Sequence, residues 1–222
     1  IMTERNILSY QETLDSHKSK ICDYKKVLGM IAGALKESSV NADVEVGGSV
    51  AKNTFLKGYD VDVFVRFKKT VDENALEKVL KNLFSKVKRV HGSRDYFQFV
   101  HKGGNYEIVP VLHIKKTSDA ENITDVSHFH VEWVRKNLKN PDHARLAKLF
   151  AKALGVYGAE SYIRGFSGYI CEILTINYGS FLNLIKKAAK WGDKVIVDVK
   201  KYYKGKNVFF EINKSKLVSP LI

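Results

Sequence analysis

Two neighbouring segments decide the fold of this chain, Val44-Glu45-Val46-Gly47-Gly48-Ser49 and Tyr59-Asp60-Val61-Asp62-Val63-Phe64-Val65. Polar and apolar residues alternate in the second segment, which is typical of a β-strand whose successive side chains point to opposite faces. The carboxylates of Asp60 and Asp62 therefore share one face. Two anions held so close repel each other unless a cation neutralises them, and carboxylate oxygens suit Mg²⁺ that is shared with substrate phosphates. We expect a divalent metal site on this strand.

The glycines that precede this strand strengthen the hypothesis. An Asp-x-Asp pair alone is a weak signal, because the solvent face of an edge strand can carry the same pattern. Glycine lets the backbone approach a phosphate closely, and amide groups at a helix start attract anions. Gly48 and Ser49 lead into a predicted helical turn. A simple turn is the alternative, but a phosphate cradle beside a carboxylate pair indicates a nucleoside triphosphate site.

At this point the sequence can be compared with a known family. The run from Gly48 to Gly58, followed by Asp60-Val61-Asp62-Val63-Phe64, resembles the signature of the DNA polymerase β-like nucleotidyltransferase superfamily. It is most similar to the archaeal-type, class I CCA-adding enzymes, which are tRNA nucleotidyltransferases. Two further segments, 155–160 and 165–174, resemble the region beyond the catalytic sheet of that family. The resemblance begins near Asp43 and covers the catalytic half of such an enzyme.

The resemblance also implies the site residues. Asp60, Asp62 and Glu107 would be catalytic and would hold two Mg²⁺ ions, although the family has an aspartate where Glu107 stands. The nucleotide, ATP or CTP, would be bound by Gly48, Ser49, Lys52, His130, Lys148 and Tyr157. Glutamate reaches one methylene further than aspartate, and lysine at position 52 replaces an arginine that many members have, which removes a bidentate fork.

Each of these residues has a plainer interpretation from the sequence alone. Glu107 could be an ordinary exposed strand residue, and a lone histidine such as His130 is more often structural than functional. Arg145, Lys148 and Lys152 are spaced three and four apart on a predicted helix, where they would form a solvated basic face. No third ligand stands near His128 and His130 at metal-binding spacing, which disfavours zinc.

Periodicity predicts an α+β fold with a mixed sheet and flanking helices, followed by a smaller, mostly helical module. The predicted domains are a catalytic head over 1–138 and a module over 139–222 that completes the nucleotide pocket. Apolar spacing predicts one or two helices within 5–35 and further helices over 72–87, 142–154 and 169–184. The 142–154 helix would bury Leu146, Leu149, Phe150 and Ala153. A hairpin over 96–112 would turn at Gly103-Gly104, and 195–199 and 208–212 would be short strands.

Composition limits the class of protein. The chain has 222 residues, with 37 Lys and Arg against 24 Asp and Glu, so its net charge is +13. Such an excess of positive charge is typical of a protein that binds nucleic acid. The sequence shows no apolar run long enough to span a membrane and no secretory signal, so we expect a cytoplasmic protein with no membrane partner. Cys22 and Cys171 are too few for a disulfide framework or a zinc site.

The sequence therefore predicts an enzyme that transfers a nucleotidyl group from CTP or ATP to the 3′-hydroxyl of tRNA and releases pyrophosphate. Family members carry further domains after the matched segment, so three interpretations stay open: a truncated chain, a natural minimal enzyme, or one subunit whose partner polypeptide supplies the missing domains. Two other function classes also stay open. One is transfer to another acceptor, such as a protein hydroxyl or a second nucleotide. The other is a non-catalytic RNA-binding module, which the intact Asp60 and Asp62 disfavour.

Overall fold

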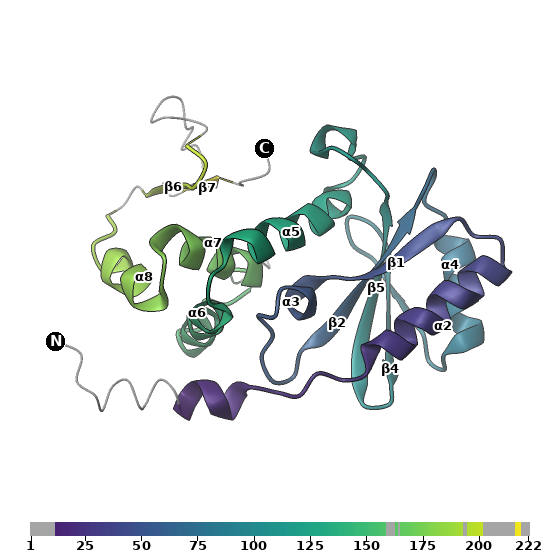
Figure 1. Cartoon of the computed structure of the whole chain (residues 1–222), viewed down its shortest axis with the longest axis horizontal. Coiled ribbons are helices and arrows are strands. Elements are labelled where there is room, and N and C mark those ends of the chain that lie inside the picture. The colour runs from purple at the N-terminus through teal and green to yellow at the C-terminus, as the bar shows by residue number, and fades with distance from the viewer. Residues whose placement is uncertain (1–11, 159–162, 164, 193–194, 202–215, 219–222) are drawn as a thin grey trace. The chain divides into compact units, whose positions relative to one another are not determined.

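The computed structural model describes residues 12–158, 163, 165–192, 195–201 and 216–218 (Figure 1). The chain divides into two compact units, residues 17–132 and residues 133–222 together with 1–16. The first unit holds α2 (Tyr24–Glu37), β1 (Ala42–Val46), α3 (Gly48–Ala51), β2 (Asp60–Phe67), α4 (Glu73–Leu83), β3 (Lys88–Val90), β4 (Tyr96–His101), β5 (Gly104–Leu112), the 3₁₀ turns Thr117–Asp119 and Ile123–Val126, and the start of α5 (Ser127–Asn137). The second holds α6 (Pro141–Ala153), α7 (Gly168–Tyr178), α8 (Phe181–Ala188), β6 (Ile196–Asp198) and β7 (Lys216–Val218).

The first unit is built on a five-stranded sheet in the order β1-β2-β5-β4-β3. β2 and β5 run parallel, whereas the other neighbours are antiparallel, so the sheet is mixed. Asp62 lies opposite Glu107 in the β2–β5 register, and Gln98 lies opposite Glu107 in the β4–β5 register. The α+β class predicted from the sequence is confirmed, and the sheet sets three polar side chains in a row across its central strands.

One face of the sheet carries the main core of this unit. Val61, Val63 and Val65 of β2 are completely buried against α2 and α4, which lie on the same side of the sheet in Figure 1. The opposite face of β2 presents Asp60, Asp62 and Phe64, because strand side chains alternate. Phe64 packs on that face in a second apolar cluster with Val111 and Val131. The valines therefore anchor the strand while the aspartates stay on the other side.

Two element boundaries in this unit differ from the sequence prediction. α4 ends at Leu83 rather than near residue 87, because Phe84 adopts an extended conformation and buries its ring against Phe99. The hairpin turns at Lys102-Gly103, and Gly104 is already the first residue of β5, paired with His101. Lys102 and Gly103 both have positive φ, as a two-residue turn that matches the strand twist requires.

Asp125 fixes the chain where it leaves β5. Its fully buried carboxylate pairs with Arg94 and accepts hydrogen bonds from the backbone N–H groups of Leu112 and Asn122 at 2.8 and 2.9 Å. Burial alone would raise the pKa of Asp125, but the hydrogen bonds from Leu112, Arg94 and Asn122 outweigh it and hold this pKa below its ordinary value. The anchored segment leads directly into α5.

The second unit differs from two of the sequence predictions, which concern the helix over 169–184 and the buried residues of α6. The predicted helix over 169–184 is two helices, because Gly179 ends α7 in the left-handed conformation and Ser180 caps α8. In α6, Ala144, Arg145, Ala147, Lys148 and Ala151 are buried, whereas Phe150 is 41% exposed and Ala153 is exposed. The small alanines let α6 approach its neighbours closely. The predicted stripe is therefore wrong for Phe150 and Ala153, whereas Leu146 and Leu149 are half-buried.

Of the two short strands predicted near the end of the sequence, the structure confirms the first and does not describe the second. Ile196–Asp198 is a strand, which pairs in parallel with Lys216–Val218. Residues 208–212, predicted as a strand, lie outside the described residues. The domain boundary at 138/139 stays a prediction. None of the helices that the structure describes is both long enough and apolar enough to cross a membrane.

Candidate active site

The glycine turn and β2 form the centre of the candidate site. The N–H of Gly47 donates a hydrogen bond of 2.7 Å to the backbone carbonyl of Asp62, which holds the turn directly on the strand. Gly48 has φ +53°, and a Cβ at this position would lie only 1.6 Å from Oδ2 of Asp62. A Cβ on Gly47 would lie 2.4 Å from the ring of Phe64. Glycine is therefore needed at both positions because a side chain would overlap Phe64 or Asp62, and at Gly48 also because of the positive φ.

The contact with the turn also determines the electrostatic state of Asp62. Burial raises the pKa of its carboxyl to about 6, and the nearby charges of Glu107 and Asp60 add to this shift. The positive charge of Lys52 acts in the opposite direction. The carboxylates of Asp60, Asp62 and Glu107 thus repel one another across adjacent strands, which is the condition that a bound divalent cation would relieve.

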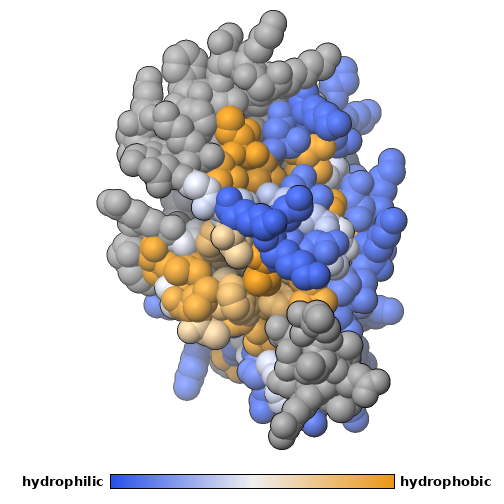
Figure 2. Space-filling view, turned by 90° about the vertical axis from the view of Figure 1, so that its left-hand side faces the viewer, coloured by the Kyte–Doolittle hydropathy of each residue, from blue (hydrophilic) through white to orange (hydrophobic). Residues whose placement is uncertain are grey.

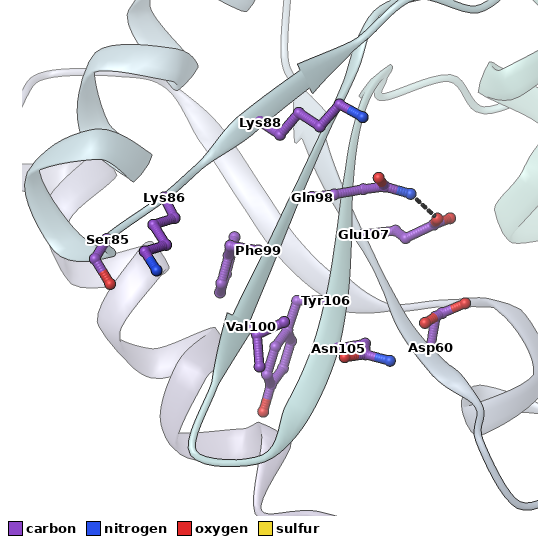
Figure 3. A pocket seen from close by; sticks show the side chains of 10 residues that line it. All are labelled: Asp60, Ser85, Lys86, Lys88, Gln98, Phe99, Val100, Asn105, Tyr106 and Glu107. Carbon is purple, nitrogen blue, oxygen red and sulfur yellow. Dashed lines mark hydrogen bonds between the residues drawn. The ribbon is translucent and has the colours of Figure 1, made fainter.

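Glu107 reaches this cluster from β5 and is held by a neighbour on β4. Nε2 of Gln98 donates a hydrogen bond of 2.6 Å to Oε1 of Glu107, drawn as a dashed line in Figure 3. Among the residues that the structure describes, no three Asp, Glu, His or Cys side chains lie close enough together to hold one ion. The bond to Gln98 holds one carboxylate oxygen of Glu107 toward β4.

A hollow of about 410 Å³ borders Asp60 and Glu107. Its lining includes Asn105 on β5, Gln98 on β4 and Lys88 at the start of β3. Lys88 lies opposite Gln98 in the register, so Asp62, Glu107, Gln98 and Lys88 form one row across four strands. Figure 3 shows the side chains of Asp60, Glu107 and Gln98 directed toward the same side of the strands.

Two of the predicted phosphate-binding residues of the first unit, Ser49 and Lys52, lie in and after the turn that packs on β2, whereas His130 lies on α5. Ser49 is the second residue of the single-turn helix α3, and Lys52 caps the end of that helix. His130 lies in α5, one residue before Val131, which packs against Phe64.

Lys148 and Tyr157 belong to the second unit, where the structure brings them together. A Cβ on Gly168, the first residue of α7, would lie 3.0 Å from the Tyr157 hydroxyl and 3.4 Å from Cε of Lys148. Nζ of Lys148 donates a hydrogen bond of 2.7 Å to Oε1 of Glu172, and both side chains are almost completely buried. The solvated basic face considered for this helix is therefore wrong, because Arg145 is also buried, and it bonds to Asp142.

Two residues of this arrangement were missed in the sequence. Gln98 could have been found by counting back from a hairpin turn at Lys102-Gly103, because the register then sets it opposite Glu107. Glu172 is the lone charged residue in Gly168-Tyr169-Ile170-Cys171-Glu172-Ile173-Leu174, and a charge in such an apolar helix normally has a buried partner. The partner itself could not be identified from sequence.

Comparisons with known proteins agree with this geometry. Residues 28–124 match the family described as nucleotidyltransferase domain, and residues 142–222 match the second domain of tRNA nucleotidyltransferase. The CCA-adding enzyme of Nanoarchaeum equitans (strain Kin4-M) is 47% identical over 204 residues, which are 89% of this chain and 52% of that protein. The CCA-adding enzyme of Pyrococcus abyssi (strain GE5 / Orsay) is 35% identical over 213 residues, covering 89% and 48%. The chain spans about half the length of these relatives.

A solved structure supports the fold. The CdnE cyclic dinucleotide synthase of Elizabethkingia meningoseptica, determined with GTP and Apcpp, superposes with a TM-score of 0.63 over 86% of this chain and 84% of its own. The two sequences are 16% identical. The likeness therefore concerns the shared polymerase β-like architecture.

The contact between Gly48 and Asp62 generates the first prediction. Gly48→Ala adds a Cβ both at positive φ and into the Asp62 carboxylate, so the turn must leave β2. Gly58→Ala is the matched control, because Gly58 has φ +78° but a methyl group added there would have no atom within 4 Å. We expect the control to lose about 1–2 kcal/mol of unfolding free energy and Gly48→Ala to lose clearly more. Equal losses in urea titrations would contradict the contact.

The raised pKa of Asp62 predicts how stability depends on pH in metal-free buffer. The folded state binds the Asp62 proton more tightly than the unfolded state, so unfolding free energy falls as pH rises from the ordinary pKa of 3.8 to about 6. Asp62→Asn should remove this loss, and above that window the variant should be more stable by up to about 3 kcal/mol.

Thermal midpoints of both proteins in EDTA, measured across this pH range, test the expectation. The difference should vanish in acid below the window, where the Asp62 carboxyl of the parent is also neutral. Glu107→Gln should reduce the pH dependence of the parent, because the Glu107 charge contributes to the shift. A difference between Asp62→Asn and the parent that stays constant with pH would show that Asp62 is not electrostatically strained.

Proposed function

The chain belongs to the archaeal-type tRNA nucleotidyltransferases, and on that premise we propose that it carries the nucleotidyl-transfer site of a CCA-adding enzyme. The reaction adds C and A from CTP and ATP to the 3′ end of tRNA. One observation carries the proposal: the carboxylates of Asp60, Asp62 and Glu107 share a sheet face directly beside a glycine turn that has no room for a side chain.

We propose that Asp60, Asp62 and Glu107 bind two Mg²⁺ ions. The fit rests on their chemistry. All three supply oxygen ligands, and burial of Asp62, together with the charges of Glu107 and Asp60, raises its pKa, which a cation would oppose. When bound, the ions would lower the pKa of the attacking hydroxyl and neutralise charge on the triphosphate. Glu107 would keep one oxygen on Gln98 and offer the other to the site, so that Gln98 compensates for the longer side chain.

The remaining residues would position the two substrates. Ser49 and Lys52, together with His130, Lys148 and Tyr157, would bind the triphosphate and the sugar. The acceptor 3′-oxygen would form a bond to the α-phosphorus, and the bond from that phosphorus to the β-phosphate oxygen would break, releasing pyrophosphate. The proton of the attacking 3′-hydroxyl would leave toward the carboxylate cluster, with help from Glu107.

The proposed function also involves the two domains, the tRNA acceptor, a second polypeptide and the cellular location. A head over 1–138 and a module over 139–222 would each contribute nucleotide ligands. Because the chain spans about half the length of its relatives, the tRNA acceptor end as substrate and a second polypeptide that completes the enzyme both stay predictions. A cytoplasmic location stays a prediction as well.

Incubation with defined tRNA ends tests the function. We expect C to enter transcripts that lack CCA, A to enter transcripts that end in CC, and nothing to enter complete tRNA when each nucleotide is supplied with Mg²⁺. Asp60→Asn is the control, because this exposed carboxylate contributes little to stability and its loss should abolish transfer while the thermal midpoint changes little. Transfer to complete tRNA, or to a protein or nucleotide acceptor instead, would contradict CCA addition.

The buried pair of Lys148 and Glu172 allows binding to be separated from stability. Lys148→Met leaves a buried carboxylate without its cation and should cost about 3–5 kcal/mol of unfolding free energy. Lys148→Met combined with Glu172→Gln removes both charges and should recover most of that loss. If Lys148 binds the triphosphate, both proteins should have a raised KM for ATP and CTP. A stable double variant with the parent KM would assign Lys148 a structural role only.

A further inference from the structure

The positive charge of the protein is concentrated in its C-terminal part. Residues 133–222 contain 17 Lys and Arg against 6 Asp and Glu, whereas residues 1–132 contain 20 against 18. The net charge of +13 therefore comes almost entirely from residues 133–222. The candidate catalytic carboxylates lie in the other, nearly neutral part, so the charge excess is not explained by that site.

Three lysines of the second unit gather around one hollow. α8 buries Phe181 and Leu184 in the apolar cluster of this unit, and its opposite face carries Asn183, Lys186 and Lys187, continued by Lys190. These residues, spaced three and four apart, line a hollow of about 650 Å³ together with Ala189 and the Tyr178 side of α7. Figure 2 views the molecule from the side on which α8 lies in Figure 1, and hydrophilic side chains gather there beside a hydrophobic area.

The three lysines differ from three exposed lysines of the first unit that have acidic partners. Lys26, Lys68 and Lys81 in the first unit pair with Asp23, Asp43 and Glu77. Within the described part of the chain, Lys186, Lys187 and Lys190 form no ion pair, and no acidic residue lines their hollow. Like charges held together without a counter-ion repel, so this arrangement favours an anionic ligand.

The plainer explanation is that cations at the end of a helix interact favourably with its dipole. Lys186 and Lys187 lie in the last turn of α8 and gain this stabilisation. The dipole does not explain Lys190, which lies beyond the helix, or why Tyr178 and Asn183 line the same hollow. Lysine ammonium, phenol and amide groups are the donors that contact phosphate and sugar in nucleic-acid complexes.

We propose that the face formed by Asn183, Lys186, Lys187 and Lys190, with Tyr178, binds the phosphodiester backbone of the RNA acceptor. This proposal rests on the proposed function, because it assigns a surface to the tRNA substrate of that reaction. The lysines act as point charges, so the contact holds RNA without reading its sequence. The hollow is open and lined by exposed side chains, which suits a backbone laid across it rather than an enclosed small molecule.

The test compares two triple variants of the full chain. Lys186→Gln, Lys187→Gln and Lys190→Gln are combined in one protein. The control combines Lys25→Gln, Lys36→Gln and Lys78→Gln, which remove the same charge from exposed positions on α2 and α4. tRNA binding is measured at several salt concentrations, and ATP and CTP binding are measured separately with Mg²⁺. Thermal midpoints confirm that both variants are folded.

We expect the α8 variant to bind tRNA roughly 10- to 100-fold more weakly at low salt, with a log–log salt slope smaller by roughly 2 to 3. The control should change the slope much less, and nucleotide binding should be unchanged in both. Equal slopes for the two variants would overturn the proposal, as would a loss confined to ATP and CTP. A parent protein that transfers no nucleotide, but whose RNA binding still depends on the α8 lysines, would refute the proposed function and leave this surface standing.

Discussion

The close approach of the glycine turn to β2 is the constraint on which the candidate site depends. Gly47 and Gly48 lie so near Phe64 and Asp62 that neither position has room for a Cβ. This contact removes solvent from one side of the Asp62 carboxylate and brings Ser49 to the same strand end. The contact that builds the candidate site therefore also raises the pKa of Asp62, because it buries the carboxylate.

The mixed sheet then determines which residues can join Asp62. Parallel pairing of β2 with β5 sets Glu107 beside Asp62, and antiparallel pairing of β5 with β4 sets Gln98 beside Glu107. The hydrogen bond from Gln98 restrains the Glu107 carboxylate, so its position is set by a neighbouring strand as well as by β5.

The sequence predicted local features better than long-range contacts. The alternation around Asp60 and Asp62 and the need for glycine at position 48 follow from strand geometry and backbone chemistry, and both are visible in the structure. The burial of Lys148 was not predictable, because its partner Glu172 lies on another helix. Likewise, helical spacing predicted that Phe150 would be buried, whereas in the folded protein the alanines of α6 are buried and Phe150 is exposed. Residues 169–184 form two helices because Gly179 has a left-handed conformation that ends α7. The apolar pattern continues past Gly179, so it did not predict this break.

The two-residue turn at Lys102-Gly103 restricts how this protein can change in evolution. The turn fixes the pairing of His101 with Gly104, and each further pair toward Gln98 and Glu107 follows from it. Because strand side chains alternate, a one-residue slip of β4 against β5 would move Gln98 to the apolar face and direct a buried phenylalanine toward Glu107. Insertions and deletions in this loop should therefore be strongly selected against, although the loop is exposed and remote from the carboxylates. Length variation among descendants of this gene should instead accumulate in connections that set no register, such as the one between α4 and β3.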